Sequence, residues 1–217
     1  MKALLYKEIK LAMHPTTYLF MAIGAMLMIP SYPYYVAFVY TCLGIFFIFL
    51  TARENKDIFF TASLPVRKSD VVKSRIFTVA IIELLQLAIG IPFAIIGIRI
   101  NPNAAGNTVG IEANMAFFGL VLIMYSLFNA IYLPLFYKTA VKVGIPLIFA
   151  GIAVMIYVVA VELAVQMIPF LKTHLDSTDP AMAIYQFPIL IAGMLIFALS
   201  LWLTYRKSAA NFEKVDL

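Results

Sequence analysis

The sequence predicts an all-α, polytopic integral membrane protein with six transmembrane helices. Of its 217 residues, 64% are hydrophobic and only 12% are charged, whereas a soluble domain carries about 25% charged residues. The apolar residues form runs close to the ~20 residues that a helix needs to cross the hydrocarbon core. Lys and Arg gather at the ends of these runs, which is the usual signal of membrane topology. These three observations define the fold class.

The N-terminal residues, 1–13, are expected to form a short helix that lies in the membrane interface. On a helical projection, Ile9 falls near one side and Lys7 and Lys10 fall near the other. Such a division of apolar and basic side chains is typical of interfacial helices. Glu8 is the exception, since it falls near the apolar edge.

Six apolar runs follow, and they are the candidate spans. The first opens after His14 and Pro15, and the turn between the first two contains Pro30 and Pro33. Gly90, Pro92 and Gly97 should bend the third span or loosen its packing. Small residues such as Gly24, Gly90 and Gly193 should let helices approach closely. The expected spans are 16–29, 34–51, 76–98, 113–137, 144–168 and 182–205, with outer loops at 99–112 and 169–180.

The segment 53–75, between the second and third spans, is the most informative part of the chain. It is too charged to enter a bilayer, yet it carries the apolar run Ile58-Phe59-Phe60, which a solvated loop does not need. We expect a first helix over 54–63 that breaks at Leu64-Pro65, because the residue before a proline leaves the helical region. A second helix, capped by Ser69 or Asp70, should lead into the third span. The apolar run predicts a docking surface.

The distribution of basic residues sets the expected orientation. Six of the 16 Lys and Arg residues lie in the segment 53–75, and only Arg99 and Lys172 fall in loops on the opposite side, which leaves 14 on one side. Basic loops stay in the cytoplasm, so both termini and the segment 53–75 should be cytoplasmic. The basic residues form no continuous face, so a nucleic-acid partner is not expected. Residues 1–217 are treated as one transmembrane domain.

Two carboxylates lie well inside the apolar runs. Glu83 belongs to the third span and Glu162 to the fifth, and Gln86 and Gln166 lie near them on the same helices. Ionisable groups inside a membrane are costly and are functional candidates by default. Either glutamate could line a transport path, or it could be protonated and hydrogen-bonded between helices. The sequence leaves both interpretations open.

The sequence contains none of the common catalytic or metal-binding patterns. It has no GxxxxGK[ST] loop to hold nucleotide phosphates, no HExxH and no GxSxG. His14 and His174 fall on opposite membrane faces under this topology, and the single cysteine, Cys42, can form neither an internal disulfide nor a cysteine-based metal cluster. We therefore expect no catalytic residue, no metal site and no cofactor on this chain.

The central segment and the six-span layout together resemble the membrane subunits of ABC type-2 exporters. Among these, the chain looks most like small bacterial permeases that pair with a separate ATPase, including exporters of amphipathic cytolytic peptides such as phenol-soluble modulins. The motif that carries the resemblance reads Glu54-x-x-Asp57-x-x-Phe60-x-x-Ser63-Leu64-Pro65-Val66, followed by Asp70-Val71-Val72-x-x-Arg75.

The resemblance implies a homodimeric permease in the bacterial plasma membrane, in contact with lipid. Two cytoplasmic ATPase subunits would bind ATP and Mg²⁺ and would drive the export of a hydrophobic or amphipathic cargo. The first helix, 54–63, would be the coupling helix, with Phe59 and Phe60 inserted into a groove on the ATPase. Alternatively, both rings fold back onto the spans. Glu54, Asp57 and Arg67 would form the polar rim of this contact and set its orientation. The residues expected to couple to the ATPase are Glu54, Asp57, Phe59, Phe60, Ser63, Leu64, Pro65 and Arg67.

Two other functions remain possible on the sequence alone. A stand-alone secondary transporter or channel would use Glu83 and Glu162 as proton or ion sites, and it would work without a cytoplasmic partner. A non-transporting membrane assembly subunit would bind a partner without ATP-linked flux. Neither the cargo nor the direction of transport can be predicted from the residues.

Overall fold

A computed structural model describes residues 2–100 and 106–215, and every regular element in these ranges is helical. Apolar side chains on all sides of most of the long segments favour helices that satisfy their own backbone hydrogen bonds. The elements are α1 (Lys2–Lys7), the π-helical turn η1 (Glu8–Ala12), α2 (Pro15–Ala22), the 3-10 helix η2 (Ile23–Met28), α3 (Tyr35–Glu54), α4 (Asp57–Ala62), α5 (Lys68–Ile100), α6 (Met115–Phe136), α7 (Gly144–Met167), α8 (Pro169–Leu175), the 3-10 turn η3 (Pro180–Met182) and α9 (Ala183–Glu213).

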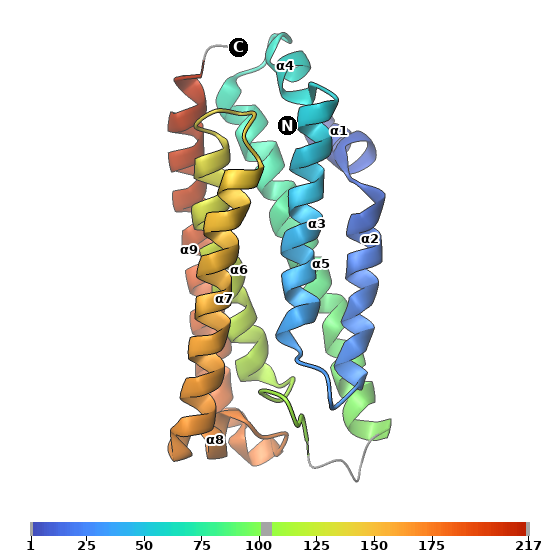
Figure 1. The fold of residues 1–217 in the computed structure, drawn as a ribbon, viewed down its shortest axis with the longest axis vertical. Coiled ribbons are helices and arrows are strands. Elements are labelled where there is room, and N and C mark those ends of the chain that lie inside the picture. Colours follow the sequence, from blue (N-terminus) through green and yellow to red (C-terminus); the bar gives the residue numbers. More distant parts are fainter. Residues whose placement is uncertain (1, 101–105, 216–217) are drawn as a thin grey trace.

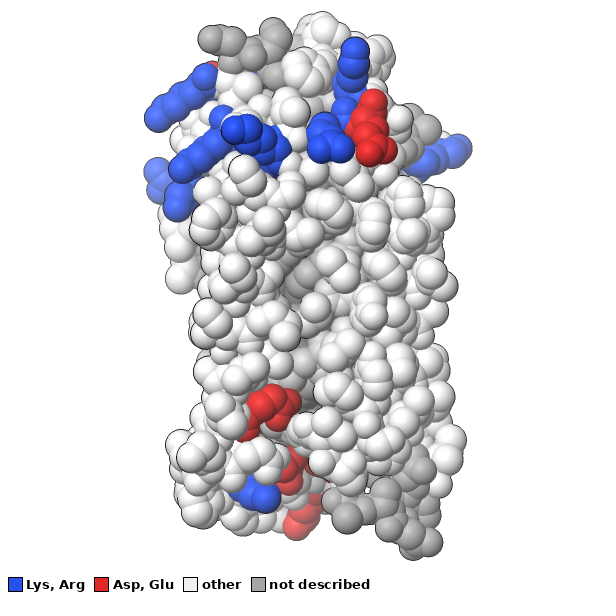
Figure 2. Space-filling model, viewed as in Figure 1, with Lys and Arg blue, Asp and Glu red and all other residues white. Residues whose placement is uncertain are grey.

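The long helices lie side by side along the longest axis of the molecule (Figure 1). Short α4 and both chain ends lie at one end of this bundle, and α8 lies at the other (Figure 1). Figure 2 shows that Lys and Arg gather toward the α4 end, whereas the middle of the molecule is almost free of charge on this face. We call the α4 end the basic end and the α8 end the far end. This distribution agrees with the asymmetry of charge in the sequence.

Five of the six expected spans are confirmed as helices long and apolar enough to cross a membrane: α3, α5, α6, α7 and the stretch Pro180–Glu213. The first expected span, 16–29, is present with almost the same bounds, but it is not one long continuous helix. It consists of α2 and η2, and it passes as a sixth span only together with the segment Leu4–Lys10, across a bend of 70°. The bend falls where Pro15 starts a new helix, since a proline cannot continue the preceding one.

The helix boundaries in the segment 53–75 differ from the prediction. Glu54 ends α3 rather than starting the next helix, and Lys56 adopts a left-handed conformation (φ 51°) that reverses the chain before α4. The break near Leu64-Pro65 is confirmed, because α4 ends at Ala62. The next helix already begins at Lys68, so Ser69 lies inside its first turn and is not a cap. The same holds for Asp70.

Close contact through small residues is confirmed where α6 and α9 cross. A Cβ atom placed on Gly119 would lie 2.6 Å from the carbonyl oxygen of Ile189, and one on Gly193 would overlap the backbone of Gly119. The two helices therefore touch backbone to backbone. At the far end, a Cβ on Gly97 would lie 2.9 Å from the carbonyl oxygen of Leu27. Glycine allows each of these approaches because it has no side chain.

The outward faces of α7 and α9 are broadly apolar. Phe149, Ile156 and Leu195 are each at least 59% exposed, and they are only examples of many such residues. A soluble monomer rarely exposes so large a contiguous apolar surface. These faces are suited to lipid or to another transmembrane helix.

Candidate functional site

Helix α4 presents two aromatic rings to its surroundings at the basic end. Ile58 is 3% exposed and points into the protein, whereas Phe59 is 42% exposed and Phe60 is 64% exposed. The alternative in which both rings fold back onto the spans does not describe this structure. Exposed phenylalanine in a charged region is unfavourable in water, because each ring forgoes roughly 2 kcal/mol of burial.

Asp57, at the start of α4, is directed into the protein. Its carboxylate accepts hydrogen bonds from Arg75 Nη2 at 2.6 Å and from Lys7 Nζ at 2.8 Å. Thr61 completes the arrangement, since its hydroxyl accepts from Lys7 Nζ at 2.8 Å and donates to the Asp57 carbonyl at 2.7 Å. Burial alone would raise the pKa of Asp57, but the charges of Arg75 and Lys7 outweigh it and hold the pKa below its usual value. Asp57 is therefore charged at neutral pH.

Arg75 is the centre of this arrangement. Its side chain is 1% exposed, and it forms a second ion pair with Glu8, whose side chain is also 1% exposed. The guanidinium lies 5.4 Å from the centre of the Phe49 ring. We call Lys7, Glu8, Asp57 and Arg75 the Arg75 cluster. Its ion pairs connect the N-terminal segment, α4 and α5.

The Arg75 cluster changes two sequence-based expectations. Glu8 is buried because Arg75 needs a second carboxylate, and as a result Ile9 is 41% exposed, which is contrary to the predicted apolar side of an interfacial helix. The sequence predicts Asp57 at the polar rim of the ATPase contact, but its carboxylate is hydrogen-bonded to Arg75 and Lys7 of the same chain. It can position α4 for a partner rather than meet the partner directly.

The outward surface at α4 contains most of the other expected contact residues. Glu54 is 60% exposed and pairs only loosely with Arg53, at 3.6 Å. Leu64 is 40% exposed. Ser63, Pro65 and Arg67 are exposed as well, so the surface formed by Glu54, Phe59, Phe60, Ser63, Leu64, Pro65 and Arg67 is called the α4 surface.

Arg75 was not recognised as a site residue from the sequence, although a signal was present. It shares one helical face with Val72 and Val79, three residues before it and four after it, and both are fully buried. An arginine on the buried face of a helix needs carboxylate partners. The sequence does not show which face of this helix is buried, so it does not reveal that Arg75 lies on that face.

Glu83, the first intramembrane candidate, is fully buried between α5 and α6. Its two carboxylate oxygens accept from Asn129 Nδ2 at 3.0 and 2.9 Å. Gln86, one turn further along α5, is also fully buried, and its amide has no hydrogen-bond partner among the described residues. Glu83 therefore has a structural role, because its hydrogen bonds with Asn129 connect α5 to α6.

We expect Glu83→Gln to leave folding nearly unchanged, because the amide oxygen of glutamine can still accept from Asn129. Glu83→Leu should instead lower the free energy of unfolding by about 1–3 kcal/mol, since it leaves the Asn129 amide buried without a partner. Unfolding can be followed through Cys42, a buried residue and the only cysteine, by its reaction with a thiol-specific dye. Equal stability of the two variants would contradict this role.

The second pair of intramembrane candidates holds loops at the far end. Glu162 accepts from the backbone N–H of Ile111 at 3.2 Å, and Gln166 donates to Asp176 at 3.2 Å. Asp176 also accepts from the backbone N–H of Glu112 at 2.9 Å. These contacts connect α7 and α8 to the loop before α6. Whether Glu162 or Gln166 also lines a transport path stays a prediction.

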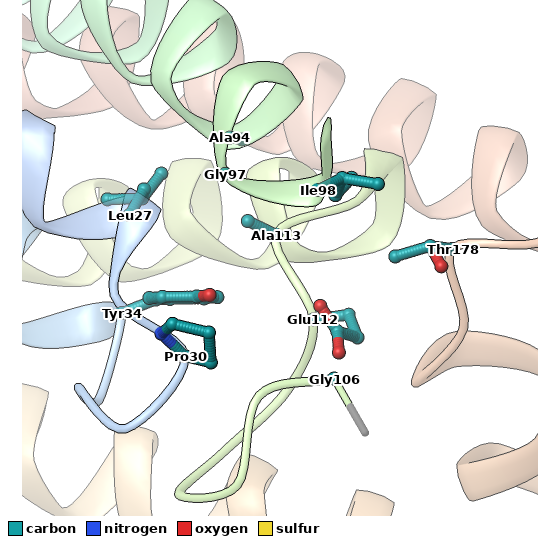
Figure 3. A pocket seen from close by; sticks show the side chains of 10 residues that line it. All are labelled: Leu27, Pro30, Tyr34, Ala94, Gly97, Ile98, Gly106, Glu112, Ala113 and Thr178. Carbon is teal, nitrogen blue, oxygen red and sulfur yellow. The ribbon is translucent and has the colours of Figure 1, made fainter. Parts of the chain in front are cut away.

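A cavity of about 130 Å³ lies beside this loop, with Glu112, Gly106 and Thr178 close together on one side and Leu27 and Tyr34 on the other (Figure 3). Burial raises the pKa of Glu112; the hydrogen bond from the Asn107 backbone lowers it, the charge of Asp176 raises it, and the net shift is upward. The cavity is small and lies at one end, so it is not a continuous path.

The two histidines have local roles. The ring of His14 accepts a hydrogen bond from the backbone N–H of Thr16 at 3.2 Å and so caps α2, while His174 stacks on Phe170 in α8 at the far end. Within residues 2–100 and 106–215, no group of three or more His, Cys, Asp or Glu residues could hold a metal ion.

The bundle of long apolar helices, the apolar outward faces and the basic end define a multi-pass membrane protein. The chain belongs to the ABC-2 family of transporter proteins, because the family model described as "ABC-2 family transporter protein" matches residues 3–213. The predicted resemblance is thereby confirmed at the level of the family, which implies association with an ABC ATPase. No curated protein and no solved structure matches the chain.

Proposed function

We propose that this chain is the permease subunit of an ATP-driven exporter, and that it works as a homodimer with two copies of a separate cytoplasmic ATPase. The sequence has no P-loop of its own, so the energy must come from another polypeptide. On this proposal the chain is not an enzyme by itself, and ATP and Mg²⁺ bind to the partner. The basic end faces the cytoplasm, in keeping with its Lys and Arg residues (Figure 2).

The observation that carries the proposal is the division of roles along α4. Ile58 and Asp57 fix the helix to the body of the protein, while Phe59 and Phe60 are left exposed beside them. A helix attached to the body of the protein in this way can transmit a movement of the ATPase to the membrane spans. Exposed aromatic rings are the usual anchors of a protein interface. Glu54 and Arg67 of the α4 surface form the polar rim that sets orientation.

The cargo we propose is a hydrophobic or amphipathic peptide, moved out of the cell. This part of the proposal rests on the likeness of the segment 53–75 to the small peptide-exporter permeases. The stand-alone transporter has less support, because Glu83 is bonded to Asn129 and Glu162 to the loop before α6. The α4 surface would also have no purpose in such a protein.

The double variant Phe59→Ala with Phe60→Ala tests the proposal. We expect a folded permease that no longer co-purifies with its ABC ATPase partner and no longer supports cargo-linked ATP turnover, because the two anchors of the interface are gone. Folding is checked by the protection of Cys42 from a thiol-specific dye.

A matched control is Phe149→Ala with Phe187→Ala, two rings that are 59% and 53% exposed on α7 and α9. It removes the same chemistry away from α4, so binding of the ATPase should stay at the wild-type level. If the α4 variant is folded and still binds the ATPase with wild-type affinity, α4 is not the coupling helix.

A further inference from the structure

An apolar groove of about 370 Å³ lies between α5 and α9 near the basic end. Phe77 and Leu84 of α5 and Trp202 of α9 are 49–54% exposed along it, so it opens to the surroundings of the bundle. The side chains deeper in the membrane are all apolar, and Lys73 lies at the basic end of the groove. The groove therefore combines an apolar floor with a positive charge at one end.

A second basic side chain, Arg206, does not line the groove itself but contacts Trp202, which does. The guanidinium of Arg206 lies 5.1 Å from the centre of the Trp202 ring, a distance at which a cation is attracted to the face of the ring. Lys73 and Arg206 are both exposed, and neither forms an ion pair with a carboxylate among the described residues. Two uncompensated positive charges thus stand beside an apolar groove at the edge of the membrane.

We propose that this groove binds an anionic phospholipid. One acyl chain lies along Phe77, Leu84 and Trp202, and the phosphate lies between Lys73 and Arg206. Juxtamembrane Lys and Arg side chains attract anionic head groups, and here two of them are placed at the end of a slot for a hydrocarbon chain. The inference rests on the proposed function in one respect: the phospholipid is placed in the cytoplasmic leaflet because the proposed function places the basic end in the cytoplasm.

Two other occupants fit the groove less well. A two-fold contact between copies of this chain across the groove would place Lys73 and Arg206 near the same residues of the second copy, so that like charges would face each other. A cargo helix is about 10–12 Å wide with its side chains, so a single turn of about 5.4 Å already fills roughly 400–600 Å³. The groove encloses only about 370 Å³, which is too little for such a helix. A single hydrocarbon chain matches this size and charge better.

The structure supplies its own reporter for a test, because Trp202 is the only tryptophan in the chain and lines the groove. The purified permease, without any ATPase, is reconstituted in phosphatidylcholine vesicles that contain increasing fractions of phospholipid with brominated acyl chains. Bromine quenches tryptophan fluorescence on contact. Brominated phosphatidylglycerol, which is anionic, is compared with brominated phosphatidylcholine, which has no net charge.

We expect half-maximal quenching at a markedly lower fraction of phosphatidylglycerol than of phosphatidylcholine. Lys73→Gln should reduce this preference by about fivefold, the effect of one basic side chain near the membrane surface. Lys207→Gln is the matched control: Lys207 is next to Arg206 in sequence but lines a different groove, between α6 and α9. It should leave the preference unchanged. Protection of Cys42 verifies that each variant is folded.

Three results would overturn the inference. Equal quenching by the two lipids would mean that Trp202 contacts bulk lipid only. An equal loss of the preference for phosphatidylglycerol in Lys73→Gln and Lys207→Gln would mean that anionic lipid is attracted to the basic end in general and not to this groove. Absence of quenching by either lipid would mean that a second copy of the chain covers the groove. None of these results involves the ATPase, so the proposed exporter function is tested separately.

Discussion

Replacing Arg75 by alanine is expected to lower the free energy of unfolding by about 3–5 kcal/mol, the usual cost of removing one partner from a buried ion pair. The reason is the burial of Glu8, which is 1% exposed and would lose its contact with Arg75, so that Lys7, 3.2 Å away, would be its one remaining ion-pair partner among the described residues. Asp57 would lose its 2.6 Å contact as well. Helix α4 should then detach from α5.

Two comparisons separate the role of Arg75 from a general effect of losing a charge. Arg53→Ala removes an arginine that is 38% exposed and whose ion-pair partner among the described residues is Glu54, so it should cost less than about 1 kcal/mol. Arg75→Lys keeps the charge but cannot reach both carboxylates as a guanidinium does, and it should fall between the two. The rate of dye reaction at Cys42 during thermal unfolding measures all three. Equal stability of Arg75→Ala and Arg53→Ala would show that the Arg75 cluster does not hold α4.

The second large effect is expected at the crossing of α6 and α9. Gly193→Ala should lower the free energy of unfolding by about 1–3 kcal/mol, the usual cost of overpacking. The added Cβ would overlap the backbone of Gly119, which cannot rotate away as a side chain can. The helices would have to separate along their whole contact.

Gly151→Ala provides the comparison for this variant. Gly151 lies in the middle of α7, and a Cβ placed there meets no atom within 4 Å. Alanine favours a helix over glycine, so this variant should be as stable as the wild type or slightly more stable. Thermal unfolding of the two variants in the same detergent gives the answer. A wild-type midpoint for Gly193→Ala would mean that α6 and α9 do not cross this closely.

The sequence predicts the long helices and the break near Leu64-Pro65 well, because both depend on local properties. Hydropathy over about 20 residues defines a span, and proline at position 65 ends the helix before it, as α4 confirms. The exposed ring of Phe60 agrees with the predicted docking surface, although the sequence alone left open that the ring folds back onto the spans. Short helices were placed less well, since Glu54 turned out to end α3.

The contacts of the polar residues could not be predicted, because transmembrane helices are apolar on nearly all sides. Without a polar face there is no period that shows which side is buried. Asn129, the partner of Glu83, stands in an apolar run with nothing to mark it, and Glu8 and Arg75 are 67 residues apart. Such pairs depend on the packing of the helices in space.

The length of α5 has a mechanical consequence. It runs from Lys68 to Ile100, 33 residues without interruption, and the Arg75 cluster fixes it near one end. With a rise of 1.5 Å per residue, about 37 Å separate Arg75 from Ile100, so a tilt of about 10° around Arg75 would displace the far end by roughly 6 Å. Helix α5 can therefore act as a lever. A small tilt at the basic end, next to α4, would move the opposite end of α5 by several ångström, at the place where Gly97 contacts the backbone of Leu27.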